Sequence, residues 1–228
     1  MANKVRFAID NSLDRLNLAL SGPSGLLAET SIKELRSPSQ ILPEKTLEIL
    51  GKHGLRVDDI TELFVTLGPG SFTGIRVALA FCKGIRAATG LSIHGIPTLD
   101  ALAFQFLDTH GSYLCPVIDA KKSEIFSALY HVDNGVLSRL TAYVTIKPAD
   151  ISQFIQQPCI LFGSGLSLCQ KYLSSEAGVT FRQGFENIKG RHLLDDRLIN
   201  LNHQQSRKLQ PIYGRRSEAE IKFSISID

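Results

Sequence analysis

The sequence lacks the features that mark secreted, membrane-spanning and metal-binding proteins. Its four cysteines form no C-x-x-C pair, so neither a zinc knot nor a redox motif is indicated. No apolar stretch is long enough to cross a membrane, and residues 1–6 lack the apolar run of a signal peptide. We therefore expect a cytoplasmic protein whose thiols are small buried groups, at Cys82, Cys115, Cys159 and Cys169.

Motifs of hydrolytic enzymes are missing as well. A zinc or iron site on a helix needs ligands four residues apart, and the six histidines provide no such pair. The segment Gly68–Ser71 lacks the G-x-S-x-G elbow of serine hydrolases. The sequence therefore disfavours a metallopeptidase and a serine hydrolase, and it predicts neither a metal nor a cofactor.

An excess of charge of one sign is also absent. The 228 residues carry a net charge of only +3, which is below the basicity of a dedicated nucleic-acid-binding domain. Hydrophobic residues make up 43% and charged residues 21%, as in ordinary globular proteins. The length allows one large domain or two small ones with a sizeable core. We expect contact with RNA only through a complex.

One stretch organises the rest of the chain. Leu63–Leu67 is a short apolar run, typical of a buried strand. Gly68, Pro69 and Gly70 then interrupt it with residues that favour a turn. A helix follows, which Ser71 or Thr73 can cap because their hydroxyl groups accept hydrogen bonds from its first N–H groups. The stretch predicts a strand, a glycine-rich loop and a helix.

A loop of this kind often holds a phosphate, so an anion site is one interpretation. It is not a P-loop, because no Gly-Lys-Ser or Gly-Lys-Thr follows, and a dinucleotide site would need Gly at position 73. The spacing favours the other interpretation, a tight turn that holds the helix against a sheet. Under either interpretation the loop residues are Gly68, Gly70, Ser71, Thr73, Gly74 and Arg76.

The helix after the loop has two apolar faces at about 100° per residue. One face contains Ile75, Ala78, Leu79 and Cys82, and the nearly opposite face contains Val77, Phe81, Gly84 and Ala88. A surface helix needs only one apolar stripe, so we expect a sheet on one side and a second helix on the other. Arg76 and Lys83 share a flank of the helix and are expected to be solvated.

The two halves of the chain repeat one order of elements. In the first half we expect an antiparallel meander, a helix, the strand–loop–helix stretch, a strand and a helix. These elements lie at residues 5–9, 16–20, 26–32, 38–51, 63–88, 91–96 and 98–107. In the second half we expect strands at 113–118, 124–130 and 136–144, a helix at 148–156, a strand at 158–162, a glycine loop and a helix to residue 173. The pattern predicts two α/β lobes, residues 1–108 and 109–228, with a charged tail from about residue 207.

The loop sequence Gly-Pro-Gly-Ser-Phe-Thr-Gly-Ile-Arg at 68–76 closely resembles the signature of the bacterial TsaB proteins, also called YeaZ. Further blocks resemble the same family, at residues 7–12, 95–102, 117–121 and 211–215. The chain departs from the family pattern in two places. The family commonly has His-Ser followed by Leu-Leu-Pro where this chain has Ser37-Pro38 followed by Ile41-Leu42-Pro43, and Gly214 stands where the family has Leu.

The resemblance implies a two-lobed actin-like ATPase fold (ASKHA, ribonuclease H-like), with duplicated mixed sheets and flanking helices. It also implies a non-catalytic subunit of the complex that makes threonylcarbamoyladenosine on tRNA. In that complex the subunit pairs with the transferase TsaD and acts beside the ATPase TsaE. The sequence is compatible with a monomer and with a homodimer of the isolated chain. The competing interpretation is an enzyme that acts alone, either sugar-kinase-like or glycoprotease-like.

In the implied fold, Asp10 and Asp119 stand at the phosphate loops of the two lobes. An active member needs glycines beside each aspartate, so that backbone N–H groups can reach the phosphates. Residues 11–14 and 120–123 contain no glycine. We therefore expect degenerate phosphate loops, and a chain that neither binds ATP tightly nor hydrolyses it.

The resemblance further implies pairing through the first lobe. We predict that the second apolar face of the loop helix joins a helix bundle across that interface. The predicted partner-binding residues are Ile41, Leu42, Val77, Phe81, Gly84 and Ala88. The alternative is that the helix near residues 41–50 covers this face within the monomer.

Overall fold

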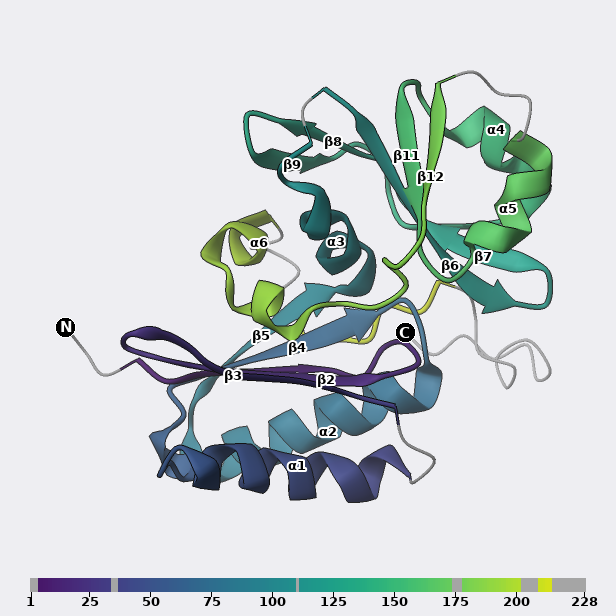
Figure 1. The fold of residues 1–228 in the computed structure, drawn as a ribbon. Coiled ribbons are helices and arrows are strands. Elements are labelled where there is room, and N and C mark those ends of the chain that lie inside the picture. The colour runs from purple at the N-terminus through teal and green to yellow at the C-terminus, as the bar shows by residue number, and fades with distance from the viewer. Residues whose placement is uncertain (1–3, 34–36, 110, 174–177, 202–208, 215–228) are drawn as a thin grey trace.

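The structure is a computed structural model that describes residues 4–33, 37–109, 111–173, 178–201 and 209–214 (Figure 1). Two β-sheets face each other across a middle layer of short helices, and further helices cover the outer face of each sheet. The predicted pair of α/β units is therefore present.

The first sheet has five strands in the order β3-β2-β1-β4-β5. The strands β1 (Arg6–Asp10), β2 (Leu16–Gly22) and β3 (Gly25–Ile32) form the predicted antiparallel meander. β4 (Glu62–Gly68) and β5 (Ser92–Pro97) continue the sheet parallel to β1. After their first residue, β1 and β4 are buried without alternation because both faces of the sheet are covered.

Two helices pack side by side on the outer face of this sheet, α1 (Pro38–Lys52) and α2 (Phe72–Thr89) (Figure 1). Ser71 caps α2, since its hydroxyl oxygen accepts a hydrogen bond from the Gly74 N–H at 3.2 Å. Gly90 ends the helix in the left-handed conformation, with a φ of 75°. The predicted strand, loop and helix are confirmed. A short 3₁₀ helix, η1 (Val57–Asp59), joins α1 to β4.

The second sheet repeats the order of the first as β10-β7-β6-β11-β12, with a hairpin of β8 and β9 added on β6. Its strands are β6 (Tyr113–Lys121), β7 (Glu124–Ser127), β8 (Tyr130–Asp133), β9 (Val136–Arg139), β10 (Val144–Ile146), β11 (Cys159–Phe162) and β12 (Val179–Arg182). Its outer helices are η3 (Pro148–Asp150), α4 (Ile151–Phe154) and α5 (Leu166–Leu173). The shared order confirms that one unit is duplicated.

The predicted single strands at 124–130 and 136–144 are wrong, because each is divided between two places in the sheet. β7 pairs with one end of β6, and after Ala128 and Leu129 the chain crosses to the other end, where β8 pairs with Tyr113 and Leu114. Apolar residues continue through the crossing, since Ala128 and Leu129 are themselves buried. The hydrophobic pattern therefore carries no sign of the break.

The middle layer contains α3 (Thr98–Ala103), η2 (Phe104–Phe106), η4 (Gly190–Leu194) and α6 (Asp196–Leu201). The predicted helix at 98–107 is thus an α-helix followed by a 3₁₀ turn. The core of this layer joins Phe64 of the first sheet to Phe162 of the second. The division after residue 108 stays a prediction, but η4, which it assigns to the second lobe, packs on β1 and β2.

Asp100 on α3 is a buried carboxylate that ties the middle layer to the second sheet. The Tyr130 hydroxyl donates to its Oδ1 at 2.5 Å, and the Tyr143 hydroxyl lies 3.0 Å from both of its oxygens. The Arg139 guanidinium is 3.5 Å from Oδ2. Burial raises the pKa of Asp100 to about 7, because Tyr130 and Arg139 only partly offset the loss of solvation.

The raised pKa of Asp100 predicts a pH dependence of stability. Its folded pKa of about 7 lies above the value of about 4 in an unfolded chain, so the folded state binds a proton more tightly. The contribution is complete below pH 4 and is lost as pH rises towards 7. Between pH 4 and 7 the free energy of unfolding, measured in urea, should therefore fall more steeply with pH in wild type than in Asp100→Asn. The expected difference between the two slopes is up to about 1.4 kcal/mol per pH unit. Asp133→Asn, at an exposed position on β8, is the control. Equal slopes for wild type and Asp100→Asn would contradict the prediction.

Candidate functional site

Asp10, at the end of β1, is enclosed by hydrogen-bond donors from its own chain. Its Oδ1 accepts bonds from the Ser12 N–H at 2.9 Å, the Ser12 hydroxyl at 2.6 Å and the Thr66 hydroxyl at 2.8 Å. The Asn17 amide donates to Oδ2 at 2.8 Å. Burial raises the pKa of Asp10, although these four donors act to lower it. The carboxylate is completely buried, so it faces neither solvent nor an open cleft.

The glycine loop packs directly on the backbone that follows β1. The Ser71 N–H donates to the Ser12 carbonyl at 2.7 Å, and the Asn11 amide donates to the Gly74 carbonyl at 3.2 Å. A Cβ atom on Gly70 would lie 2.1 Å from the Ser12 carbonyl oxygen, and one on Gly74 would lie 2.0 Å from that of Asn11. This contact needs glycine at both positions. It supports the interpretation of the loop as a joint between helix and sheet.

The second half of the chain contains a comparable close contact between a glycine loop and a strand, but it lies before the aspartate and not after it. A Cβ atom on Gly163 would lie 2.3 Å from the Val117 carbonyl oxygen, to which the Gly165 N–H donates at 3.0 Å. Asp119 follows on β6 and is only half-buried. Its carboxylate accepts bonds from the Lys121 N–H at 2.7 Å and the Lys121 ammonium at 2.8 Å. Burial alone would raise the pKa of Asp119, but Lys121 holds it below its usual value.

Residues 209–214 dock on the glycine loop as an extended segment. Leu209 is buried in the core beneath the first sheet, and the Ile212 N–H donates to the Leu67 carbonyl at 2.7 Å. The Gly214 carbonyl accepts a bond from the Thr145 hydroxyl of β10. The segment therefore contacts both sheets. It belongs to the charged, weakly periodic tail that the sequence predicts from about residue 207. Residues 207–208 and 215–228 of the predicted tail lie outside the described residues.

The structure divides the predicted partner-binding residues into three groups. Ile41 and Leu42 are only 3% and 0% exposed, so the expectation that they face a partner is corrected: they belong to the core of the first lobe. Val77 and Phe81 are half-buried against that core, so the monomer covers them in part. Gly84 and Ala88 are exposed.

The outer face of the helix pair also contains residues that the sequence did not single out. Leu47 of α1 is 61% exposed, and Ala80 and Ala87 of α2 are exposed as well. The missed signal is the position of Leu47 between exposed charged neighbours, Glu44 and Glu48. We call Leu47, Ala80, Gly84, Ala87 and Ala88 the outer helix face.

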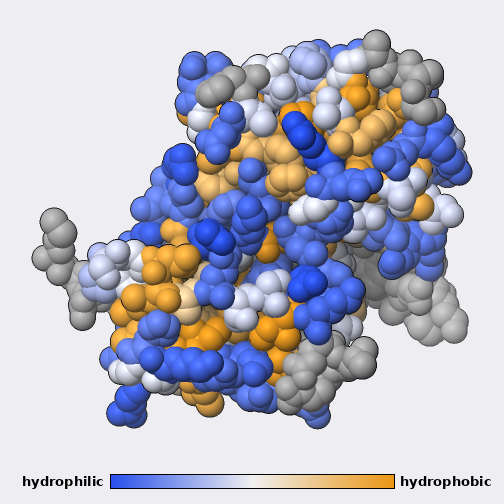
Figure 2. Space-filling view, in the orientation of Figure 1, coloured by the Kyte–Doolittle hydropathy of each residue, from blue (hydrophilic) through white to orange (hydrophobic). Residues whose placement is uncertain are grey.

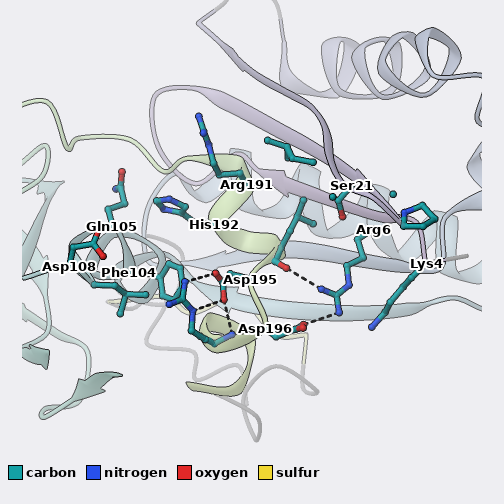
Figure 3. Close-up of a pocket in the computed structure, with 17 residues that line it drawn as sticks. Lys4, Arg6, Ser21, Phe104, Gln105, Asp108, Arg191, His192, Asp195 and Asp196 are labelled. Atoms are coloured by element: carbon teal, nitrogen blue, oxygen red, sulfur yellow. Dashed lines mark hydrogen bonds and ion pairs between the residues drawn. The ribbon is translucent and has the colours of Figure 1, made fainter. Parts of the chain in front are cut away.

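A hollow of about 920 Å³ lies between the β2–β3 turn, η2 and the η4–α6 segment (Figure 3). Its basic residues pair with carboxylates: Arg6 with Asp196 at 2.8 Å and Arg197 with Asp195 at 2.9 Å. Lys4 and Arg191 pair in the same way, with Glu62 and Glu29. Because positive and negative groups alternate around it, the hollow holds no excess charge for an anion. Its lining comes from separate segments of the chain, which the sequence did not connect.

The thiols behave as the sequence predicted. All four cysteines are buried, and burial raises the pKa of Cys82, Cys115 and Cys169 to about 12. Within the described ranges, no three His, Cys, Asp or Glu side chains are placed to hold a metal ion. No helix of that part of the chain is long and apolar enough to cross a bilayer.

Sequence comparison relates the chain to tRNA-modification proteins. A family model described as TsaD, tRNA N6-adenosine threonylcarbamoyltransferase, matches residues 30–170. The tRNA threonylcarbamoyladenosine biosynthesis protein TsaB of Bacillus subtilis is 24% identical over 224 residues, which cover 95% of this chain and 96% of that protein. The TsaB protein of Escherichia coli is 28% identical over 182 residues, or 78% of each chain.

Two solved structures from Pseudomonas aeruginosa share the fold. One is described as an uncharacterized protein with similarity to peptidase YeaZ. It is 19% identical with a TM-score of 0.76, and the match covers 93% of this chain and 100% of that chain. The other, YeaZ, has a TM-score of 0.72 and 19% identity over 92% of this chain and 99% of its own.

The duplicated mixed sheets, with one glycine joint in each half, define a two-lobed protein of the actin-like ATPase fold. The chain belongs to the TsaB (YeaZ) family, within the wider group that the TsaD model describes.

The two helical glycines of α2 provide a matched test of the joint. Gly74→Ala would place a Cβ atom 2.0 Å from backbone, whereas Gly84→Ala meets nothing within 4 Å. We expect Gly74→Ala to destabilise the chain by roughly 2–4 kcal/mol, and Gly84→Ala to stabilise it by about 0.5–1 kcal/mol through helix propensity. Urea unfolding of both variants measures the difference. A Gly74→Ala variant as stable as wild type would show that the loop is not packed as described.

Proposed function

We propose that this chain is the non-catalytic subunit of the complex that forms threonylcarbamoyladenosine on tRNA. In this proposal it binds and activates a TsaD-type transferase through the outer helix face. The family supports the proposal, because the relatives from Bacillus subtilis and Escherichia coli are named for that biosynthesis. Contact with TsaE and with tRNA would follow through the complex.

The observation that carries the proposal concerns Asp10, the predicted phosphate-loop acid of the first lobe: contacts within the chain itself occupy this residue and the backbone beside it. Asp10 uses both of its carboxylate oxygens for donors of its own chain, and the Asn11–Ser12 backbone fills the inner side of the glycine loop. A phosphate could reach neither group without breaking these bonds, whose loss leaves buried polar atoms unpaired. This arrangement favours a scaffold over a phosphotransferase.

The outer helix face supplies the surface that a scaffold needs. On α2 this face carries only methyl side chains or none, at Ala80, Gly84, Ala87 and Ala88, so another helix can approach α2 closely. Leu47 adds an exposed apolar side chain on the neighbouring helix α1. Burying a leucine in an interface contributes roughly 1.5–3 kcal/mol. The face therefore fits a helical partner, as in the helix bundle predicted from the sequence.

The second candidate is an enzyme that acts alone, sugar-kinase-like or glycoprotease-like. One solved neighbour is described by its similarity to a peptidase, but that likeness concerns the fold. A kinase would need a carboxylate as its base. Of the two predicted phosphate-loop aspartates, Asp10 is buried and Asp119 is half-exposed, so Asp119 is the candidate for this role. Replacing it therefore separates the two candidates.

A charge on the outer helix face should prevent assembly. We expect Leu47→Asp to weaken binding to the TsaD of the same organism by about two orders of magnitude or more, because burial of leucine is lost and an unpaired carboxylate is desolvated. Calorimetry, after size exclusion has shown that wild type and TsaD form a complex, measures the change. Phe81→Asp is a less direct probe, since Phe81 also packs on the core of the first lobe.

Val136→Asp is the matched control, because Val136 is 63% exposed but lies on β9 of the second sheet. It should bind TsaD as wild type does. A Leu47→Asp variant that keeps its melting temperature and its affinity for TsaD would place the interface elsewhere.

The carboxylates of Asp10 and Asp119 should be dispensable for the transfer of threonylcarbamoyl to tRNA. We expect Asp119→Asn to leave threonylcarbamoyl transfer by the reconstituted complex within about twofold of wild type, because in the scaffold model no proton passes through this residue. Asp10→Asn should behave in the same way if it folds, but it loses buried hydrogen bonds and is the less clean variant. Turnover is measured on tRNA at saturating complex. A loss of a hundredfold or more with an intact complex would favour the enzyme candidate.

A further inference from the structure

Three side chains form a rigid, exposed group at the N-terminal end of α2. The Arg76 guanidinium carbon lies 3.8 Å from the centre of the Phe72 ring, and its Nε donates to the Tyr213 hydroxyl at 2.8 Å. The Phe72 and Tyr213 rings are 5.3 Å apart. Phe72 and Tyr213 are nevertheless 43% and 42% exposed. Arg76 is exposed, as the sequence predicted, but its side chain also contacts both rings, which the sequence did not predict.

Tyr213 is fixed at this position by the docked segment of residues 209–214. The hydrogen bond from the Ile212 N–H to the Leu67 carbonyl and the burial of Leu209 hold the segment on the glycine loop. A Cβ atom on Gly68 would lie 2.7 Å from the Ile212 carbonyl oxygen, so the contact is close. Side chains held in this way lose little rotamer freedom on binding.

The guanidinium keeps hydrogen-bonding capacity on its outer side. Among the described residues, its one hydrogen-bond partner is Tyr213, through Nε. No carboxylate of that part of the chain lies within ion-pair distance of Arg76. The two terminal nitrogens can therefore donate together to a carboxylate in the bidentate geometry that arginine favours.

The group adjoins the outer helix face. Arg76 precedes Ala80 by four residues, so the two are neighbours on the surface of α2. Tyrosine, phenylalanine and arginine are enriched in protein interfaces, and tyrosine and arginine often carry most of the binding energy. A partner helix seated on the outer helix face would have this group at its end.

We propose that Phe72, Arg76 and Tyr213 anchor the partner subunit by binding a carboxylate side chain on its surface. The inference rests on the proposed function, and it adds the C-terminal segment to the interface. It identifies the partner group as an aspartate or glutamate set in an apolar surround that covers both rings. Loss of the charge or of the planar fork then weakens the complex.

The test is calorimetric titration of the TsaD of the same organism with single variants of the full chain. Arg76→Gln removes the charge but can still donate to the Tyr213 hydroxyl, and Arg76→Lys keeps the charge but not the fork. We expect both variants to bind at least about tenfold more weakly than wild type. The affinity of wild type should also fall more steeply with salt than that of Arg76→Gln. Arg86→Gln, exposed near the other end of α2, and Tyr172→Phe, at a tyrosine 41% exposed on α5, are the matched controls and should bind as wild type does.

The outcomes separate this inference from the proposed function. If both Arg76 variants fold and bind TsaD as wild type does, while Leu47→Asp fails to bind, the proposed role of Arg76 is overturned and the proposed function stands. Normal binding of TsaD by the Arg76 variants with weaker binding of tRNA by the complex would also overturn it, because the anion would then be a phosphate. If wild type itself does not bind TsaD, both proposals fall. If Arg76→Gln melts well below wild type, Tyr213→Phe decides the question. This variant removes only the hydroxyl to which Arg76 donates, and we expect it to bind TsaD severalfold more weakly.

Discussion

The contact between the glycine loop and the backbone of Asn11 and Ser12 is the constraint on which the first lobe depends. It brings the start of α2 against the end of β1 with no side chain between them, because Gly70 and Gly74 leave only backbone at the contact. Beside this contact, Ser12, Asn17 and Thr66 donate hydrogen bonds to Asp10, and its carboxylate lies inside the core. Once this joint is made, the direction of α2 and the exposure of its outer side are fixed together.

Three of the blocks of sequence that resemble the TsaB family meet at this place. Residues 7–12, the loop at 68–76 and the segment at 211–214 are far apart in the chain, yet each contacts another of the three. In the second half, the block at 117–121 contacts the glycine loop at 163–165, and Asp119 there is only half-buried. A close contact of a glycine loop is therefore present in both halves, while the surroundings of the two aspartates differ.

The sequence predicted the elements whose signals are local. Strand β4, the cap at Ser71 and helix α2 depend on neighbours within a few residues, and they lie where the pattern places them. The break between β7 and β8 could not be predicted, since it depends on which end of β6 is free to pair. The course of residues 209–214 depends on Leu67 and Arg76, more than 130 residues earlier in the chain. Ile41 and Leu42 were assigned to an interface and not to the core for a related reason. An apolar position on a helix indicates that it is buried, but not whether the same chain or a partner buries it. The order of elements along the chain was predictable because the two halves repeat it, and the exposure of the outer helix face was predictable only in part.

The buried thiols have a practical consequence for studies of this protein in solution. Four cysteines with no accessible sulfur, three of them with a pKa of about 12, react slowly with maleimides and other thiol reagents at neutral pH. A single cysteine introduced at the surface would then be the dominant site of labelling in the native chain. Fluorescent or spin probes could report on assembly without first removing the natural cysteines, and the core around them would stay intact.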